Sequence, residues 1–263
     1  MELIELIIIL ILTGAGCGAG ISVSVASGTA SPLVIPLLTA LIALPIHQAI
    51  GISLFVDSII GITAGSLFYL KEHVDKLKIP LIAIPGGLGA LMGSQLTTKA
   101  SESSLLGIIG VILLLIGSNF AIFGIQKNIQ MVNRRFSFTF FKNHEMIMMI
   151  FLGFALGIIS GFLGIGVGAI VALILIFMFN RDIKVAIGTS LFVMAIITGF
   201  GVIGHGFEGV VLHWSVLPLG FGAVLGSVIG STFANKIPEG LLGRVIGVII
   251  IVFGMIMLLR LLV

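Results

Sequence analysis

Apolar runs of about 20 residues recur along this chain, separated by short polar or charged stretches. A helix of that length crosses the ~30 Å hydrocarbon core of a bilayer. Hydrophobic residues make up 59% of the sequence and charged residues 9%, against roughly 25% charged in a soluble domain. The pattern therefore predicts an all-α polytopic membrane protein and excludes a water-soluble fold.

Ten apolar segments can be drawn, so we expect about ten transmembrane or half-membrane helices. Two of them, 31–44 and 167–180, are too short for an untilted span, and each follows a Gly/Ser-rich interruption. We expect these two to be half-helices or short tilted spans. The ten segments are about 3–26, 31–44, 47–70, 79–98, 103–125, 145–163, 167–180, 184–205, 215–234 and 239–263.

The sequence also resembles itself, because residues 49–117 align with residues 186–254 at a constant shift of 137 without a gap. Such self-similarity predicts two copies of one structural unit. We therefore divide the chain into a first membrane repeat (1–126), a cytoplasmic linker (127–144) and a second membrane repeat (145–263). The most specific matches are Gly51/Gly188, Ser53/Ser190, Gly89/Gly226, Gly93/Gly230, Ser94/Ser231, Lys99/Lys236 and Glu102/Glu239.

Each repeat holds five segments, an odd number, so the second copy should enter the membrane in the opposite sense to the first. If every segment crosses or returns, eleven basic residues fall on one face and only Lys99 and Arg260 on the other. An eight-span alternative divides them eight to five. The positive-inside rule favours two inverted five-segment repeats in the cell membrane, with both termini outside the cytoplasm.

The linker region 126–144 combines basic residues with several phenylalanines. Two interpretations stay open for it. It is a connector that sets the orientation of the chain, or it binds the anionic headgroups of membrane lipids.

Two interruptions of the apolar pattern are the strongest functional candidates. The first reads Ser27-Gly-Thr-Ala-Ser31, and the second, at the same shift, reads Gly164-Ile-Gly-Val-Gly168. Irregular backbone is tolerated at membrane depth only where protein or a water-filled cavity satisfies it. Each interruption also precedes a helix, whose first N–H groups attract negative charge.

In an inverted repeat the two interruptions approach each other near the midplane, where transporters of this build hold their substrate. We expect a small anion there. The alternative is that the glycines only let helices pack closely, the interpretation we favour for Gly14, Gly18, Gly153, Gly157 and Gly161. The substrate-binding candidates are Ser27, Gly28, Thr29, Ala30, Ser31, Gly164, Ile165, Gly166 and Gly168.

The duplicated elements Gly51–Phe55 and Gly188–Phe192 add Ser53, Thr189 and Ser190 to these candidates. The serines either donate to the oxygens of an anion or bond back to a carbonyl one turn earlier.

Asp57 lies one helical turn beyond Ser53, on the same face, well inside an apolar segment. A carboxylate at that depth costs at least ~2.5–3.5 kcal/mol, so it should face the protein interior and carry a role. We treat it as a candidate for proton coupling, against a buried structural hydrogen bond.

Other classes of function find no support in the sequence. Cys17 is the only cysteine, which excludes an internal disulfide, and the five histidines show no metal-ligand spacing. No Gly-rich loop ends in Gly-Lys-Ser/Thr, so ATP is not expected as an energy source. The net charge of +3 comes from loop residues and implies no nucleic-acid partner. We expect no enzyme, no cofactor, no metal and no catalytic residue.

The run Gly161-Phe-Leu-Gly-Ile-Gly-Val-Gly168, the element Ala186-Ile-Gly-Thr-Ser-Leu191 and their echoes in the first half resemble the sulfite exporter TauE/SafE family, also called the TSUP transporters. The resemblance covers nearly the whole chain. It implies movement of small sulfur-containing anions, such as sulfite, sulfoacetate or other organosulfonates, through a bacterial or archaeal cytoplasmic membrane. The first interruption departs from the family pattern, because Ser27–Ser31 replaces the usual glycine cluster.

The resulting hypothesis is a secondary active, proton-coupled transporter of such anions. Its alternative is a passive anion channel or an accessory membrane subunit without coupled transport. Substrate identity, direction of transport and oligomeric state are left open by the sequence.

Overall fold

The computed structural model describes residues 2–115, 145–179, 181–206 and 213–233, together with isolated positions after 115 and after 247. Every regular element in this part of the chain is a helix, as the sequence predicts. Six helices are long and apolar enough to cross a membrane. They are α1 (Glu2–Ala26), α3 (Ile46–Leu70), α4 (Lys78–Lys99), α7 (Glu145–Leu163), α9 (Ile183–Gly206) and α10 (Val216–Phe233).

Three further helices are shorter: α2 (Ser31–Leu41), α8 (Gly168–Phe177) and the helix Glu102–Leu115. With 11 and 10 residues, α2 and α8 are each about 16 Å long at ~1.5 Å per residue, half the thickness of the hydrocarbon core. The predicted half-helices are therefore present. Pro32 lies in the first turn of α2, where its missing N–H costs nothing.

The boundary of the first predicted repeat, the linker 127–144 and nearly all of the tenth predicted segment, 239–263, lie outside the described residues.

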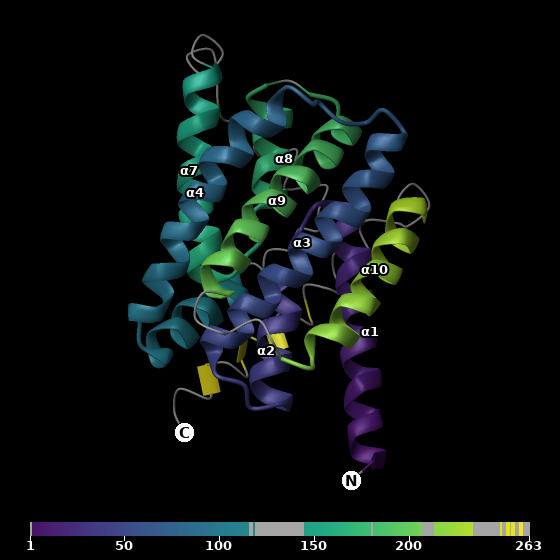
Figure 1. Ribbon diagram of the computed structural model, residues 1–263, viewed down its shortest axis with the longest axis vertical. Coiled ribbons are helices and arrows are strands. Elements are labelled where there is room, and N and C mark those ends of the chain that lie inside the picture. Colours follow the sequence, from purple (N-terminus) through teal and green to yellow (C-terminus); the bar gives the residue numbers. More distant parts are fainter. Residues whose placement is uncertain are drawn as a thin grey trace.

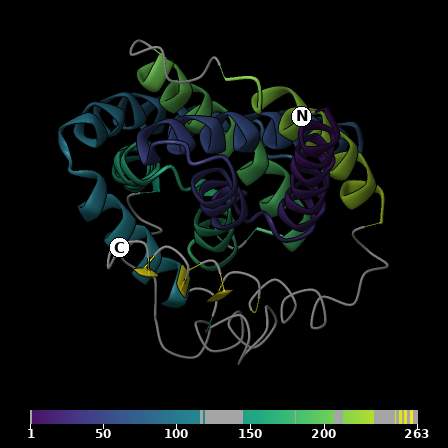
Figure 2. The same ribbon diagram turned by 90° about the horizontal axis from the view of Figure 1, so that it is seen from below.

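The antiparallel helices α3 and α9 form the centre of the bundle (Figure 1). Their apolar windows are 61% buried, against 28–44% for the other four long helices. The pair α4 and α7 packs on one side of this centre, through contacts of α4 with α9, and the pair α1 and α10 packs on the other, through contacts of α10 with α3. The half-helices α2 and α8 pack against α3 and α9 respectively. Figure 2 shows the same bundle from the end at which α1 begins.

Glycines bring the backbones of the flanking pairs into direct contact. A Cβ on Gly157 of α7 would collide with the carbonyl oxygen of Gly86 in α4, and a Cβ on Gly16 of α1 would collide with that of Leu219 in α10. Small residues allow such approach between helices in lipid, where van der Waals contact drives association.

The predicted packing role of glycines is confirmed for Gly153, Gly157 and Gly161, which all face carbonyls of α4. It is wrong for Gly14 and Gly18, beside which a Cβ would meet no atom within 4 Å. On α1 the packing face is formed by Gly16 and Gly20 instead. A helix repeats every 3.6 residues, so glycines spaced by two cannot share one face.

Charged side chains gather at the end of the bundle where α3 finishes and α7 begins. Lys78 at the start of α4 forms an ion pair with Glu145 of α7. Arg181 pairs with Asp75 at 2.9 Å, which ties the α8–α9 connection to the α3–α4 turn. These contacts hold four helices together at one face of the bundle.

Candidate functional site

The two interruptions are breaks in the helical path with the same backbone signature. Helix α1 ends at Ala26 and the chain turns at Ser27, whose φ is 53°. Helix α7 ends at Leu163 and the chain turns at Gly164, whose φ is 69°. Left-handed φ is easy for glycine and strained for serine. We call residues 27–31 the first break and residues 164–168 the second break.

The two breaks touch each other inside the bundle, as the sequence predicts. The hydroxyl of Ser31 donates to the carbonyl oxygen of Gly164. The backbone N–H of Gly166 donates to the hydroxyl oxygen of Thr29 at 2.8 Å. A Cβ on Gly168 would lie 2.7 Å from the carbonyl oxygen of Ser27, so the contact is close enough to require glycine there.

The carboxylate of Asp57 lies where these amides converge. The N–H of Ala30 donates to Oδ1 at 2.6 Å, and the N–H of Gly166 donates to Oδ2 at 3.1 Å. The hydroxyl of Thr29 is 2.7 Å from Oδ2, and that of Ser31 is 3.4 Å away. Both carboxyl oxygens therefore accept from backbone amides, one from each break.

Asp57 therefore faces the protein interior, as expected from its cost in lipid. The side chain has no exposed surface. Its amide donors come from both breaks: along the chain, Ala30 lies 27 residues from Asp57 and Gly166 lies 109 residues from it. We call the Ala30 and Gly166 amides together with the Thr29 and Ser31 hydroxyls the donor cluster.

Ser53 and Ser190 each lie against the residue with left-handed φ in one of the breaks. Ser53 donates to the carbonyl oxygen of Gly164 at 3.3 Å. The hydroxyl of Ser190 lies 2.5 Å from that of Ser27 and also donates to the carbonyl oxygen of Ile187 one turn earlier, at 2.9 Å. The back-bonding alternative thus holds for Ser190, while Ser53 bonds across to the second break.

Three of the predicted site residues lie apart from the donor cluster. Thr189 faces the α3–α4 turn and accepts a hydrogen bond from the N–H of Asp75 at 2.8 Å. Gly28 is half-buried, with open space where a Cβ would be. Ile165 is half-buried and packs on the hydrophobic core. The sequence pattern could not separate these residues from their neighbours, because one position along a helix or turn changes the direction of the side chain.

Met194 of α9 lies 137 residues after Asp57 and also borders the second break. A Cβ on Gly166 would lie 2.6 Å from Oδ2 of Asp57 and 3.0 Å from the sulfur of Met194. A Cβ on Gly168 would lie 3.0 Å from the same sulfur. The second break thus passes between a carboxylate on α3 and a thioether on α9, and the shift of 137 could have indicated this pairing.

The arrangement suits an oxyanion. Its donors are neutral backbone amides and hydroxyls at the starts of half-helices, whose dipoles favour negative charge. No hydrogen bond or ion pair recorded for the described residues joins a Lys or Arg to the donor cluster. The same part of the chain contains no group of three or more His, Cys, Asp or Glu side chains that could hold a metal ion.

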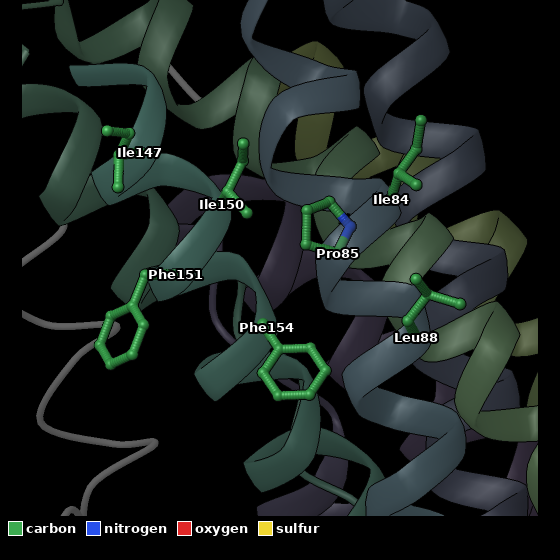
Figure 3. A pocket seen from close by; sticks show the side chains of 7 residues that line it. All are labelled: Ile84, Pro85, Leu88, Ile147, Ile150, Phe151 and Phe154. Atoms are coloured by element: carbon green, nitrogen blue, oxygen red, sulfur yellow. The ribbon is translucent and has the colours of Figure 1, made fainter. Parts of the chain in front are cut away.

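An apolar surface groove lies elsewhere, between α4 and α7 (Figure 3). Its volume is about 550 Å³ and its lining is apolar: Ile84, Pro85 and Leu88 of α4, with Ile147, Ile150, Phe151 and Phe154 of α7. Most of these side chains are exposed on the outer surface of the bundle. The groove offers almost no polar surface to an anion, so it is not the candidate site.

Comparisons with known proteins agree on a membrane transporter. Residues 12–257 match the family described as "Sulfite exporter TauE/SafE". The chain is 30% identical over 237 residues to "Probable membrane transporter protein YdhB" of Bacillus subtilis (strain 168), covering 86% of this chain and 90% of that protein.

Two further relatives are more distant. "Probable membrane transporter protein YunE" of Bacillus subtilis (strain 168) is 25% identical over 217 residues, with 78% of each chain covered. "Probable membrane transporter protein" of Xylella fastidiosa (strain Temecula1 / ATCC 700964) is 24% identical over 255 residues, with 92% of each covered. No solved structure matches the chain.

Proposed function

Starting from the fact that the chain belongs to the sulfite exporter TauE/SafE family of multi-pass membrane transporters, we propose that it is a secondary active, proton-coupled transporter of small sulfur-containing anions. Sulfite, sulfoacetate and other organosulfonates are the candidate substrates. One observation carries the proposal: the amides of Ala30 and Gly166, from two breaks far apart in sequence, converge on one buried carboxyl group.

The donor cluster supports an anionic substrate because it already satisfies an anion. A carboxylate, a sulfite and a sulfonate all present at least two oxygens on one central atom, and charge-assisted hydrogen bonds from N–H and O–H groups to such oxygens are the strong kind. In this cluster the two amides reach different oxygens of Asp57. A sulfonate could accept from the same donors in the same way.

The proposal includes two inverted repeats. Three observations support it. The bounds of α1, α2, α3 and α4 correspond to those of α7, α8, α9 and α10 at the shift of 137 within a few residues. The antiparallel direction of α3 and α9 is the one that inversion requires (Figure 1).

Contacts between the flanking helices give the third support. Gly20 faces the carbonyl of Ala223, and Gly157 faces the carbonyl of Gly86. Gly157 is Gly20 shifted by 137, and Ala223 is Gly86 shifted by 137, so the same contact occurs twice. Ser58 donates to the carbonyl oxygen of Ala195, again 137 residues away. A residue can contact the residue equivalent to it in the other half only near a twofold axis. Thr29 and Gly166, which are also 137 residues apart, make a second contact between equivalent positions.

The proposed orientation has both termini outside the cytoplasm of a cell membrane. Lys71, Lys78 and Arg181 are positioned by contacts at the same end of the bundle, which would be the cytoplasmic face by the positive-inside rule.

Asp57 is the proposed coupling residue. The groups around it are the amides and hydroxyls of the first break and α2, the Gly166 amide of the second break and, across Gly166, the Met194 thioether of α9. None of these groups titrates. The exchange of a proton at this position would therefore fall on Asp57 itself.

The alternative is a passive anion channel or an accessory subunit. Burial of most of the site favours a transporter. Ser27, Ser53, Asp57 and Ser190 are 0% exposed and Ser31 is 1% exposed, while Thr29 is half-buried. A channel in its conducting state keeps a continuous path, whereas alternating access requires a state in which the site is closed.

The test is uptake of sulfite, sulfoacetate, taurine and sulfate into proteoliposomes containing the full chain, with an imposed proton gradient. We expect sulfite or a sulfonate to accumulate above its external concentration, and accumulation to lose its dependence on pH in Asp57→Asn. Asp75→Asn, which removes a carboxylate at the end of the bundle, is the matched control and should keep the wild-type pH profile. Equilibration without accumulation would instead identify a channel.

A further inference from the structure

We propose that the Asp57 carboxylate is an internal ligand of the substrate site: it occupies the donor cluster in the empty protein, and a small monovalent oxyanion binds by taking its place. This inference rests on the proposed function and identifies what the substrate competes with. It follows from the observation that the donors expected to face a substrate are already engaged with a side chain of the protein.

The donors cannot serve both anions at once. The Ala30 amide has one hydrogen and gives it to Oδ1 of Asp57 at 2.6 Å. The Gly166 amide is shared between Oδ2 and the hydroxyl oxygen of Thr29. An arriving anion must therefore receive these hydrogens after Asp57 has taken up a proton and given them up, because two negative charges in one buried site repel each other strongly.

The fit around the carboxylate explains why displacement, and not simple addition, is needed. Gly166 lies so close that even one added carbon would be 2.6 Å from Oδ2, with the sulfur of Met194 3.0 Å from the same point. The close contact of Gly166 with Asp57 leaves no room for an oxyanion between the second break and the carboxyl group. The substrate has to enter the volume that the carboxylate group occupies.

The chemistry of the donors also selects the charge of the ligand. Neutral amides and hydroxyls that hold one carboxylate satisfy a single negative charge without a cationic partner. A dianion such as sulfate would bring a second buried charge that these donors leave uncompensated, at high cost. The site should therefore prefer a sulfonate or hydrogensulfite to sulfate.

The experiment removes the internal ligand and supplies external ones. Purified full-length wild type, Asp57→Ala and Asp57→Asn are titrated with methanesulfonate, acetate and sulfate, and binding is followed by calorimetry and by thermal unfolding. We expect Asp57→Ala to bind methanesulfonate at least tenfold more tightly than wild type. Acetate, which replaces the missing carboxylate, should raise the Tm of Asp57→Ala and leave that of wild type unchanged.

Two controls make the result specific. Asp75→Ala removes a carboxylate that pairs with Arg181 away from the cluster, and its methanesulfonate affinity should equal that of wild type. Thr29→Val in the Asp57→Ala background removes one donor and should weaken methanesulfonate binding again. Should Asp57→Ala fail to fold, Asp57→Asn keeps the shape of the side chain without its charge and should still bind methanesulfonate more tightly than wild type.

Failure of this inference can be told apart from failure of the proposed function. If wild type transports sulfite or sulfonates but neither Asp57 variant binds methanesulfonate more tightly, displacement is overturned and the transporter stands. If wild type moves none of these anions while Asp57→Ala gains methanesulfonate and acetate binding, displacement holds and the proposed substrate class is overturned.

Discussion

The first break carries three hydroxyl groups, on Ser27, Thr29 and Ser31, whereas the second break carries three glycines and no polar side chain. Both turn through a left-handed residue and both lead into a half-helix. The first break contributes side-chain donors in addition to an amide, and the second contributes an amide and the room for close approach.

This difference is matched on the central helices. Asp57 of α3 receives the donors of both breaks, while Met194 of α9, at the equivalent position, presents a thioether to Gly166 and Gly168. Two regions with the same backbone geometry therefore have different chemistry. The two breaks thus share a backbone geometry that presents amides to one point, and the side chain of the central helix in the first half decides which group accepts from them.

Gly166→Ala should have the largest effect, because its Cβ would lie 2.6 Å from Oδ2 of Asp57. The new carbon separates the carboxylate from the Gly166 amide, combining overpacking with a lost bond to a charged group, about 3–5 kcal/mol in total. The free energy of unfolding in detergent measures it. Gly28→Ala in the first break, where a Cβ meets no atom within 4 Å, should change stability by about 0.5 kcal/mol or less. Equal effects would contradict the proposed asymmetry.

Gly164→Ala tests the left-handed turn of the second break. Its φ of 69° is unfavourable for alanine by about 1–2 kcal/mol, and a Cβ would lie 2.7 Å from Cγ2 of Ile50, so we expect a loss of about 2–4 kcal/mol. Ser27→Gly should relieve the backbone strain of the left-handed φ at the first break, and it should lose only the side-chain contact with Ser190. A stability change near zero for Ser27→Gly, beside a large loss for Gly164→Ala, is the expected thermal-unfolding result.

Thr29→Val tests the side-chain contribution of the first break with little change of shape. It removes the hydroxyl that contacts Oδ2 of Asp57 and the N–H of Gly166, so we expect a loss of about 1.5–3 kcal/mol and weaker substrate binding. Thr189→Val is the matched control, because that hydroxyl accepts from the Asp75 amide away from the cluster. Its binding affinity should stay at the wild-type value. A loss of binding in Thr189→Val would restore Thr189 to the site.

Ser53→Ala and Ser190→Ala should have the smallest effects. Ser53 donates at 3.3 Å to a Gly164 carbonyl that also accepts from Ser31, and Ser190 shares a single hydrogen bond with the hydroxyl of Ser27. Each substitution should cost about 1 kcal/mol or less. Transport assays at saturating substrate should show nearly wild-type rates, and a loss of more than tenfold in either variant would place that serine among the substrate ligands.

Several features of the site follow from sequence alone. The positions of both breaks, the half-helices behind them and the inward-facing Asp57 were predictable, because apolar runs, small-residue interruptions and the cost of a charge in lipid all act locally. The packing glycines of α1 were not. The alternative sets Gly14/Gly18 and Gly16/Gly20 have the same spacing, and only contact with α10 distinguishes them.

The amino-acid sequence thus determined an all-helical membrane chain with two interrupted segments and a family of transporters. The tertiary structure decided that Ala30 and Gly166 donate to the same carboxylate and that Thr189 faces elsewhere. The physical reason is that hydrogen bonds across more than 100 residues depend on how whole helices cross, whereas membrane insertion and helix breaks depend on the composition of each segment.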